Sequence, residues 1–263
     1  MTDEEIRGHA KSCRLTAIKM AYQCGMNAHL GGGLSLIEIL SVLYGDILRR
    51  EDKFVLSKGH GVLGFYAVLA EFGRMPRELL ATFQQDGSDL IAHPVRNQEL
   101  GIEASTGSLG QGISFAVGLA LAAKRKHRDE EVYVLCGNGE ANEGSVWEAA
   151  MSAVNFQLDH FTLMIDNNHL QSDGVSREIM NVSDRYAAML EALGFETFEV
   201  DGHDVAALRA VFEKGRQTGR PRAVIAHTVK GKGISFMENN NDWHHARLTQ
   251  AQYEAAVAEL KGA

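Results

Sequence analysis

Residues 131–144 read EVYVLCGNGEANEG, an apolar run that ends in a turn containing three glycines. The apolar run predicts a buried strand, and the segment SVWEAAMSAVNF after the turn has the pattern of a helix. A glycine turn between a strand and a helix offers free backbone N–H groups to an anion. The stretch therefore predicts a phosphate-binding turn, in which the uncharged Asn138 stands between Gly137 and Gly139.

The same alternation of strand and helix continues through the rest of the chain. Apolar runs predict strands at 53–57, 131–136, 160–166, 195–200 and 222–228, and helical patterns occupy 34–48, 62–73, 113–126, 145–156, 184–194 and 205–215. The segments 25–33 and 86–108 are predicted loops. Strands that alternate with helices are typical of an α/β fold, a parallel sheet with helices on both faces. In such sheets ligands bind beyond the carboxyl ends of the strands.

Composition narrows the class of protein. The chain has 263 residues, of which 45% are hydrophobic and 23% charged, and no linker divides it, so we expect 1–263 to form a single domain. The net charge of −8 disfavours a nucleic-acid partner. The acidic N-terminus MTDEEIRGHA lacks a signal-peptide core, and no stretch approaches about 18 uninterrupted apolar residues. We therefore expect a cytoplasmic protein with no membrane partner.

The three cysteines form no metal or disulfide pattern. Cys13, Cys24 and Cys136 are scattered and include no C-x-x-C pair. Cys13 and Cys24 belong to a series of apolar residues at helical spacing, which runs Ile6, Ala10, Cys13, Ala17, Met20, Cys24. We interpret both thiols as buried on one face of a helix.

Two common phosphate motifs do not fit the glycine turn. A dinucleotide fingerprint has glycine at the third position of G-x-G-x-x-G, where this chain has Asn142. Its acidic partner should end the next strand, whereas Asp159 precedes one. A P-loop would need a lysine followed by serine or threonine, which is missing.

A second polar turn follows the next strand. The sequence NNHLQSDG comes after the run HFTLMID, and Asn168 lies 30 positions after Asn138, since 168 − 138 = 30. In a βαβ unit this spacing places both residues at the carboxyl ends of neighbouring strands. Two side-chain oxygens and a loop carbonyl form a partial ligand set for a hard cation such as Mg²⁺, which completes its shell with phosphate and water.

At this point the sequence resembles the transketolase family. The glycine turn followed by Asn-Asn is similar to the thiamine diphosphate signature, in which Gly-Asp-Gly precedes Asn-Asn by about thirty residues. Words typical of transketolases occur in the family's order from Ala28 to His244: FVLSKGHG, AHPVRN, EASTGSLGQG, VDGHD and VKGKGISFMENNNDWH. The resemblance covers nearly the whole chain.

The resemblance implies a fold, an activity and a partner. It implies the thiamine diphosphate-binding fold of the diphosphate domain, with the pyrimidine-binding and C-terminal domains expected on a separate polypeptide. This chain would be the N-terminal subunit of a split transketolase that uses thiamine diphosphate and Mg²⁺, or Ca²⁺ or Mn²⁺. The enzyme would transfer a two-carbon ketol unit from a ketose phosphate to an aldose phosphate. We expect an assembly of two copies of each subunit.

The resemblance also implies roles for particular residues. The metal would be held by Asn138, Asn168 and the carbonyl of Leu170. The cofactor would contact His60, Gly107, Ser108, Leu109, Gly137, Asn138, Gly139, Glu140, Asn168, Leu170 and His244. Catalytic roles would fall to His29, His60, His93, His244, Glu143 and Glu148. Histidines suit such a site because they exchange protons near neutral pH.

The chain departs from the family pattern at three places. Gly-His-Pro-Gly becomes Ala-His-Leu-Gly around His29, and His245 stands where glycine usually follows His244. The largest departure is Asn138, where the family has aspartate; a neutral amide binds a hard dication more weakly than a carboxylate does. Two alternatives therefore stay open: a non-catalytic or weakly cofactor-binding paralogue, and a thiamine diphosphate enzyme with another donor, such as an acyl donor.

Overall fold

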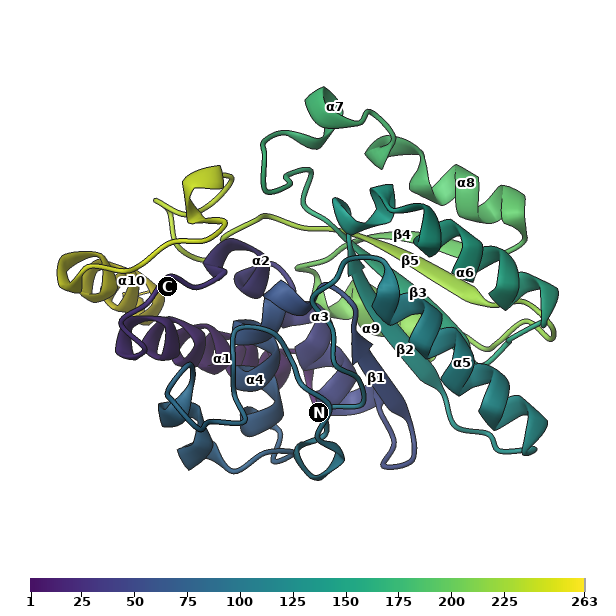
Figure 1. The fold of residues 1–263 in the computed structure, drawn as a ribbon, viewed down its shortest axis with the longest axis horizontal. Coiled ribbons are helices and arrows are strands. Elements are labelled where there is room, and N and C mark those ends of the chain that lie inside the picture. Colours follow the sequence, from purple (N-terminus) through teal and green to yellow (C-terminus); the bar gives the residue numbers. More distant parts are fainter. Residues whose placement is uncertain (263) are drawn as a thin grey trace.

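The computed structural model describes residues 1–262 and contains one five-stranded parallel sheet (Figure 1). Its strands are β1 (Lys53–Leu56), β2 (Val132–Gly137), β3 (Phe161–Asn167), β4 (Glu196–Asp201) and β5 (Arg222–His227), in the spatial order β1-β2-β3-β5-β4. Each predicted strand is confirmed to within one residue at either end. The fold class predicted from the sequence is therefore confirmed.

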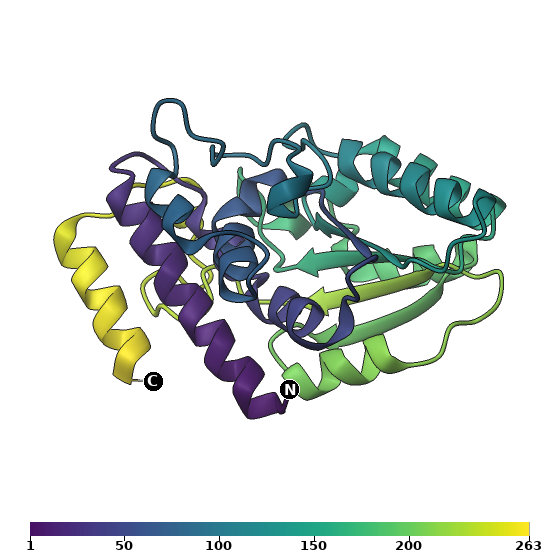
Figure 2. The ribbon, with the colours of Figure 1, turned by 90° about the horizontal axis from the view of Figure 1, so that it is seen from below.

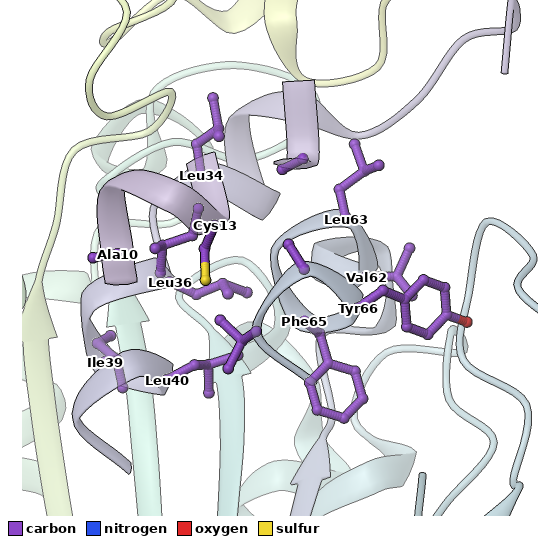
Figure 3. Close-up of a cluster of buried hydrophobic side chains, with 14 of the residues drawn as sticks. Ala10, Cys13, Leu34, Leu36, Ile39, Leu40, Val62, Leu63, Phe65 and Tyr66 are labelled. Atoms are coloured by element: carbon purple, nitrogen blue, oxygen red, sulfur yellow. The ribbon is translucent and has the colours of Figure 1, made fainter. Parts of the chain in front are cut away.

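Helices cover both faces of the sheet (Figure 1). One face is covered by α3 (Ile37–Val42), α4 (Val62–Glu71) and α9 (Val205–Glu213), with α1 (Asp3–Gln23) packed on the outer side of these helices, and the other by α5 (Gln111–Arg125), α6 (Gly144–Asn155) and α8 (Tyr186–Leu193). The inner strands β2, β3 and β5 are mostly apolar because both of their faces are buried, whereas the edge strand β4 is partly exposed and carries charged residues. In β2, Tyr133 and Leu135 enter the first core, and Val134 and Cys136 enter the second. Figure 3 shows part of the first core, where Leu40 of α3 lies near Phe65 of α4.

Further helices and turns complete the chain. They are α2 (Leu30–Leu34), a π-helical turn (Leu43–Ile47) that extends α3, α7 (Ser176–Ile179) and α10 (Gln250–Gly262), with 3₁₀ turns at Gly59–Gly61, Arg77–Thr82, Gln98–Leu100, Glu140–Asn142, Ser183–Arg185 and Asn241–Trp243. The sequence did not predict α10, which packs along α1 with Tyr253 stacked on Tyr22 at a ring distance of 4.3 Å (Figure 2). The predicted loop at 25–33 is wrong at its end, since α2 already begins at Leu30.

Helix α1 begins with a complete capping box. The Thr2 hydroxyl accepts a hydrogen bond from the Glu5 backbone N–H, and the Glu5 carboxylate accepts one from Thr2 N. The predicted apolar face is buried from Ile6 to Met20. The prediction fails at Cys24, which is only half-buried because it caps the helix where the chain turns away from the core.

One apolar segment, Leu30–Ile47, is long and hydropathic enough to cross a membrane. Its residues are 78% buried inside the fold, where α2, α3 and the π turn form the first core. Core packing accounts for its composition.

Helices α2 and α4 cross in near contact at two glycines. A Cβ on Gly64 would lie 2.0 Å from the carbonyl oxygen of Gly33, so only glycine permits this crossing. His29 precedes α2 and His60 lies in the turn before α4. The crossing therefore sets the distance between these two histidines, whose ring centroids lie 5.5 Å apart.

We predict that Gly64→Ala destabilises the chain strongly. The backbone carbonyl of Gly33 cannot move aside without separating α2 from α4, and overpacking of this kind costs about 1–3 kcal/mol or more. Gly8→Ala in α1 is the matched control, because nothing lies within 4 Å of its added methyl group. The control should be neutral or stabilising by up to about 1 kcal/mol. Equal midpoints for the two variants in urea unfolding would contradict this account of the crossing.

Candidate functional site

A pocket of about 530 Å³ lies at the carboxyl ends of the strands. The glycine turn after β2, the polar turn after β3 and the segments before α2 and α4 all contribute to its walls. The structure brings together here the predicted residues His29, His60, His93, Gly107, Leu109, Gly137, Asn138, Gly139, Glu140, Glu143, Asn168, Leu170 and His244. Ser108 and Glu148 do not line it, and both are exposed.

The floor of the pocket is held by a buried ion pair. Asp166, at the end of β3, accepts hydrogen bonds from the ammonium of Lys58 and the hydroxyl of Thr228, and from the Ser35 hydroxyl at 2.6 Å. Lys58 is 1% exposed and Asp166 is fully buried. Burial alone would raise the pKa of Asp166, but the Lys58 charge and these hydrogen bonds lower it overall. The carboxylate thus joins segments that follow β1, β3 and β5.

A second buried carboxylate shapes the glycine turn. Glu140 is 1% exposed and accepts hydrogen bonds from Ser57 Oγ at 2.5 Å, Gly110 N at 2.9 Å and Gly137 N at 3.2 Å. Burial raises its pKa. Since these bonds engage both oxygens, Glu140 connects the turn with the start of α5, and its predicted cofactor contact stays a prediction.

Asn138, Asn168 and Leu170 converge as predicted, but the amide of Asn138 is turned. Its Nδ2 donates to the Leu170 carbonyl at 3.2 Å and to Ser176 Oγ at 2.6 Å, while the Leu170 N–H donates to Asn168 Oδ1 at 3.1 Å. Before Asn138 can offer Oδ1 to a cation beside Leu170, its amide must rotate. No cluster of three or more His, Cys, Asp or Glu within residues 1–262 could hold a metal.

These neutral oxygens therefore fit a cation only in part. An amide oxygen and a backbone carbonyl are hard ligands of the kind Mg²⁺ accepts, but none carries a charge. The set suits an ion whose charge is balanced by a bound diphosphate. The metal roles of all three residues stay predictions.

Five histidines gather at one side of the pocket. His29 is central, with ring centroids at 5.5 Å from His60, 5.6 Å from His93, 5.4 Å from His244 and 4.4 Å from His245. Burial and the neighbouring imidazoles lower the pKa of His29 to about 3, and burial lowers those of His60 and His93. These three rings are thus neutral at pH 7 and able both to donate and to accept hydrogen bonds.

Two buried lysines in the pocket wall escaped the sequence prediction. Lys58 and Lys230 are 1% and 2% exposed, and both line the pocket. Lys58 is neutralised by Asp166, whereas Lys230 donates to neutral acceptors. Burial and the charge of Lys58 lower the pKa of Lys230 to about 8. Both lysines lie in glycine-rich segments, SKGH and VKGKG, and this position in the sequence could have identified them as pocket residues.

Gln171 is a third residue that the sequence reasoning missed. It lines the pocket, and its Nε2 has no hydrogen-bond partner among the described residues although that atom is buried. A Cβ on Gly139 would lie 3.2 Å from the Gln171 side chain, so this glycine leaves room for Gln171.

Gly107, in the segment GSLG, must be glycine for a similar steric reason. Its φ is 147°, and a Cβ there would lie 3.1 Å from the His93 side chain.

Of the remaining histidines, His203 has a defined structural place outside the pocket. Its Nδ1 bonds Glu38 at 2.9 Å, and its Nε2 accepts the Val229 N–H at 2.8 Å. Arg14 pairs with the same carboxylate and donates to the Lys232 carbonyl at 3.0 Å. Although burial opposes it, the charge of Arg14 lowers the pKa of Glu38 to about 2. This network anchors the segment that carries Lys230.

The sequence profile of the family "Transketolase, thiamine diphosphate binding domain" matches residues 7–261. The chain belongs to the transketolase family. Among curated proteins it is 38% identical to one of the subunits of the apulose-4-phosphate transketolase of Actinobacillus succinogenes, over 98% of this chain and 96% of the relative. It is 39% identical to a 6-deoxy-6-sulfo-D-fructose transketolase subunit of a Clostridium species, over 89% and 88% of the two chains.

Full-length transketolases share the fold but are longer. The crystal structure of transketolase from Campylobacter jejuni matches with a TM-score of 0.90 and 30% identity, over 99% of this chain and 43% of that one. The human transketolase is 35% identical over 98% of this chain and 42% of its own length. The chain therefore spans less than half of these transketolases. The prediction that the chain belongs to a family of transferases is confirmed. The predicted fold, that of the thiamine diphosphate-binding domain of transketolases, is confirmed as well.

We predict that Asp166→Asn destabilises the chain by about 3 kcal/mol or more. The substitution leaves the Lys58 ammonium buried without a counter-charge, which is far more costly than losing an exposed pair. Glu4→Gln is the matched control, since Glu4 is 89% exposed and lies 3.8 Å from Arg7. Its effect should stay within about 0.5 kcal/mol. Denaturant unfolding of both variants gives the comparison, and a loss at Asp166 no larger than the control's would contradict this account.

Proposed function

We propose that the chain is the N-terminal, diphosphate-binding subunit of a split transketolase that uses thiamine diphosphate and a divalent cation, preferably Mg²⁺. The observation that supports it most is the convergence of Asn138, Asn168 and Leu170 beside the glycine turn, in the pocket that also gathers the histidines. This arrangement pairs a place for a phosphate-bound cation with neutral imidazoles.

The diphosphate would lie against the turn Gly137–Gly139. Asn138, Asn168 and the Leu170 carbonyl would hold the cation, and the ammonium of Lys230 would offset further phosphate charge. The segment Gly107–Leu109 would lie along the aminopyrimidine ring, and Ser108 would contribute through its backbone. When bound, thiamine diphosphate supplies the electron sink that carbon–carbon bond cleavage needs.

The histidines would act on the sugar rather than on the metal. His29, His60, His93 and His244 are neutral or nearly so at pH 7, since burial depresses their pKa values. Neutral imidazoles can hydrogen-bond the hydroxyls of a ketose, and those with a free acceptor nitrogen can move a proton between its oxygens. Their separate ring positions around His29 would fix one orientation of the substrate.

The substrate class follows from chemistry shared with the relatives. Two similar proteins are named for apulose-4-phosphate and 6-deoxy-6-sulfo-D-fructose, both sugars with an anionic group. We infer a ketose that carries a phosphate or a sulfonate as donor and an aldose phosphate as acceptor. A donor panel with the assembled enzyme also tests the alternative of an acyl donor such as pyruvate.

The remaining half of the site would come from a partner. Similar proteins of about the same length are named as single subunits of a transketolase, and the chain spans less than half of full-length transketolases. We infer a cytoplasmic 2+2 heterotetramer in which a second polypeptide supplies the pyrimidine-binding and C-terminal domains. Residues 1–263 would form the single diphosphate-binding domain. Glu143 and Glu148 are exposed and would face that partner across the boundary.

The turned amide favours one competing function. With its NH₂ on the Leu170 carbonyl, Asn138 closes the metal position by itself, as a paralogue with weak cofactor binding would. The retained histidines and the buried Lys230, whose ammonium meets only neutral acceptors, argue for the active enzyme, because a protein released from catalysis has no need of a costly buried cation.

Asn138→Asp separates these functions. Without metal, the variant should be less stable than the parent chain, because a carboxylate would face the Leu170 carbonyl without a hydrogen to donate to it, although the Ser176 hydroxyl could still donate to the carboxylate. With Mg²⁺ and thiamine diphosphate, it should bind the cation roughly tenfold more tightly, or by about 1.4 kcal/mol. Calorimetric titration and thermal unfolding with and without Mg²⁺ measure both effects.

Asn155→Asp is the control for added charge, since Asn155 is exposed at the end of α6. The active-enzyme proposal expects cofactor binding and turnover by the parent chain together with its partner. It fails if the parent chain neither binds cofactor nor turns over substrate while Asn138→Asp recovers both. Equal affinity in the two variants would mean that the rotated amide ligates adequately.

The outer face of α5 and α6 is the proposed contact with the partner. Phe115 of α5 and Met151 of α6 are large apolar side chains that are 41% and 51% exposed. We predict that Phe115→Lys weakens assembly with the partner at least tenfold and leaves the stability of the isolated chain within about 0.5 kcal/mol. Ala255→Lys on α10 is the control, an exposed position remote from α5. Analytical ultracentrifugation of the mixtures decides; assembly unaffected by Phe115→Lys would place the partner elsewhere.

A further inference from the structure

We propose that Lys230 is a positioning residue that fixes His244 as the neutral tautomer with its proton on Nε2. The ammonium of Lys230 lies 2.9 Å from Nδ1 of His244. An ammonium group has three donors and no acceptor. Nδ1 must therefore be the acceptor in this contact, and the ring proton resides on the other nitrogen.

The contacts around Lys230 leave its ammonium no freedom. Its three N–H groups meet three acceptors: the carbonyl of Gln171 at 3.2 Å, Oδ1 of Asn241 at 2.7 Å and His244 Nδ1. The Asn241 amide is itself oriented, because its Nδ2 donates to the Ser172 carbonyl at 2.9 Å. Oδ1 of Asn241 thus faces the ammonium, and the third donor is left for the imidazole.

The aliphatic part of Lys230 lies in a tight slot. A Cβ on Gly31 would be 2.8 Å from Lys230 Cγ, and the Gly231 N–H donates to the Gly31 carbonyl at 3.0 Å. This backbone contact attaches the lysine segment to the first turn of α2, next to His29. Because the stem is confined, the ammonium cannot leave Nδ1 without moving the segment.

The consequence concerns which atom His244 offers to the pocket. With Nδ1 occupied, the atom free to meet a ligand is Nε2–H, a hydrogen-bond donor and not a base. Burial, Lys230 and Lys58 lower the pKa of His244 to about 4, so the ring does not gain a second proton at neutral pH. The other titratable groups around the ring are His29, His60, His245 and Asp173.

This inference deepens the proposed function, on which the meaning of the donor rests: Nε2–H would bind an oxygen of the sugar or cofactor. The tautomer itself exists without cofactor or partner. Its failure and the failure of the proposed function can therefore be told apart. If His244 carries its proton on Nδ1, the inference is wrong but the proposed function still stands. If the proton is on Nε2 but the chain binds no cofactor, the proposed function is wrong but the inference still stands.

The test is nitrogen NMR of the ring nitrogens in the full chain labelled with ¹⁵N-histidine. The chain has 11 histidines, and the His244 signals are assigned by their loss in His244→Gln. We expect a single Nε2–H tautomer in the unmodified chain from pH 7 to pH 5, where the Lys230 ammonium is protonated. A protonated Nδ1 at pH 7 overturns the inference, and this arm needs no variant at Lys230.

Lys230→Met provides the second arm. Without the cation at Nδ1, the midpoint at which His244 gains its second proton should rise by about one pH unit, a tenfold change in proton affinity. Lys232→Met is the matched control, because Lys232 lies in the same segment but pairs with Glu238 at 3.4 Å. It should leave the midpoint unchanged. A merely structural role for Lys230 lowers stability without moving the midpoint, and a midpoint that does not rise in Lys230→Met contradicts the assignment.

Discussion

The pocket depends on one buried ion pair, Lys58 with Asp166. Two opposite charges that are almost completely buried must stay together, since separation would leave either one without solvent or partner. The same carboxylate accepts hydrogen bonds from Ser35 and Thr228. Because these residues lie at the ends of α2, β1, β3 and β5, a single side chain sets the positions of the segments that carry the other pocket residues.

A balance of charge follows from this arrangement. Asp166 neutralises Lys58, whereas the ammonium of Lys230 meets the neutral acceptors of Gln171, Asn241 and His244, so its positive charge stays unbalanced in the pocket wall. Asn138 adds no negative charge where a carboxylate would. The pocket floor is consequently more positive than one with aspartate at 138, and it suits an anion such as a diphosphate. A weaker metal site and a stronger electrostatic field can thus support the same ligand.

Much of this molecule was predictable from the sequence, and the reason is local. The inner strands β2, β3 and β5 are mostly apolar because both of their faces are buried, which makes runs such as 132–136 distinctive. Once the strands are predicted, the residues directly after each strand are the candidates for the site, because ligands bind at the carboxyl ends of parallel strands. Asn138 and Asn168 were paired by their spacing alone, and the structure brings their segments together.

What escaped prediction depends on contacts between distant segments. The pairing of Lys58 with Asp166 joins residues 108 positions apart, and no local pattern reports it. Helix α10 has little amphipathic pattern and is held by packing such as Tyr253 on Tyr22. The half-burial of Cys24 likewise depends on the turn of the chain at the end of α1, and the orientation of the Asn138 amide depends on its contacts with Leu170 and Ser176.

The central claim is that the Asn138–Asn168–Leu170 cluster holds the cation of a bound diphosphate. The most direct measurement is a crystal structure of the chain, co-expressed with a candidate partner encoded near it, with thiamine diphosphate and Mn²⁺. Anomalous scattering locates the manganese without assumption. The account predicts one peak within bonding distance of Asn138 Oδ1, Asn168 Oδ1 and the Leu170 carbonyl, with the Asn138 amide rotated. Cofactor bound in the pocket with manganese elsewhere, or the cofactor bound away from the Gly137–Gly139 turn, would contradict it.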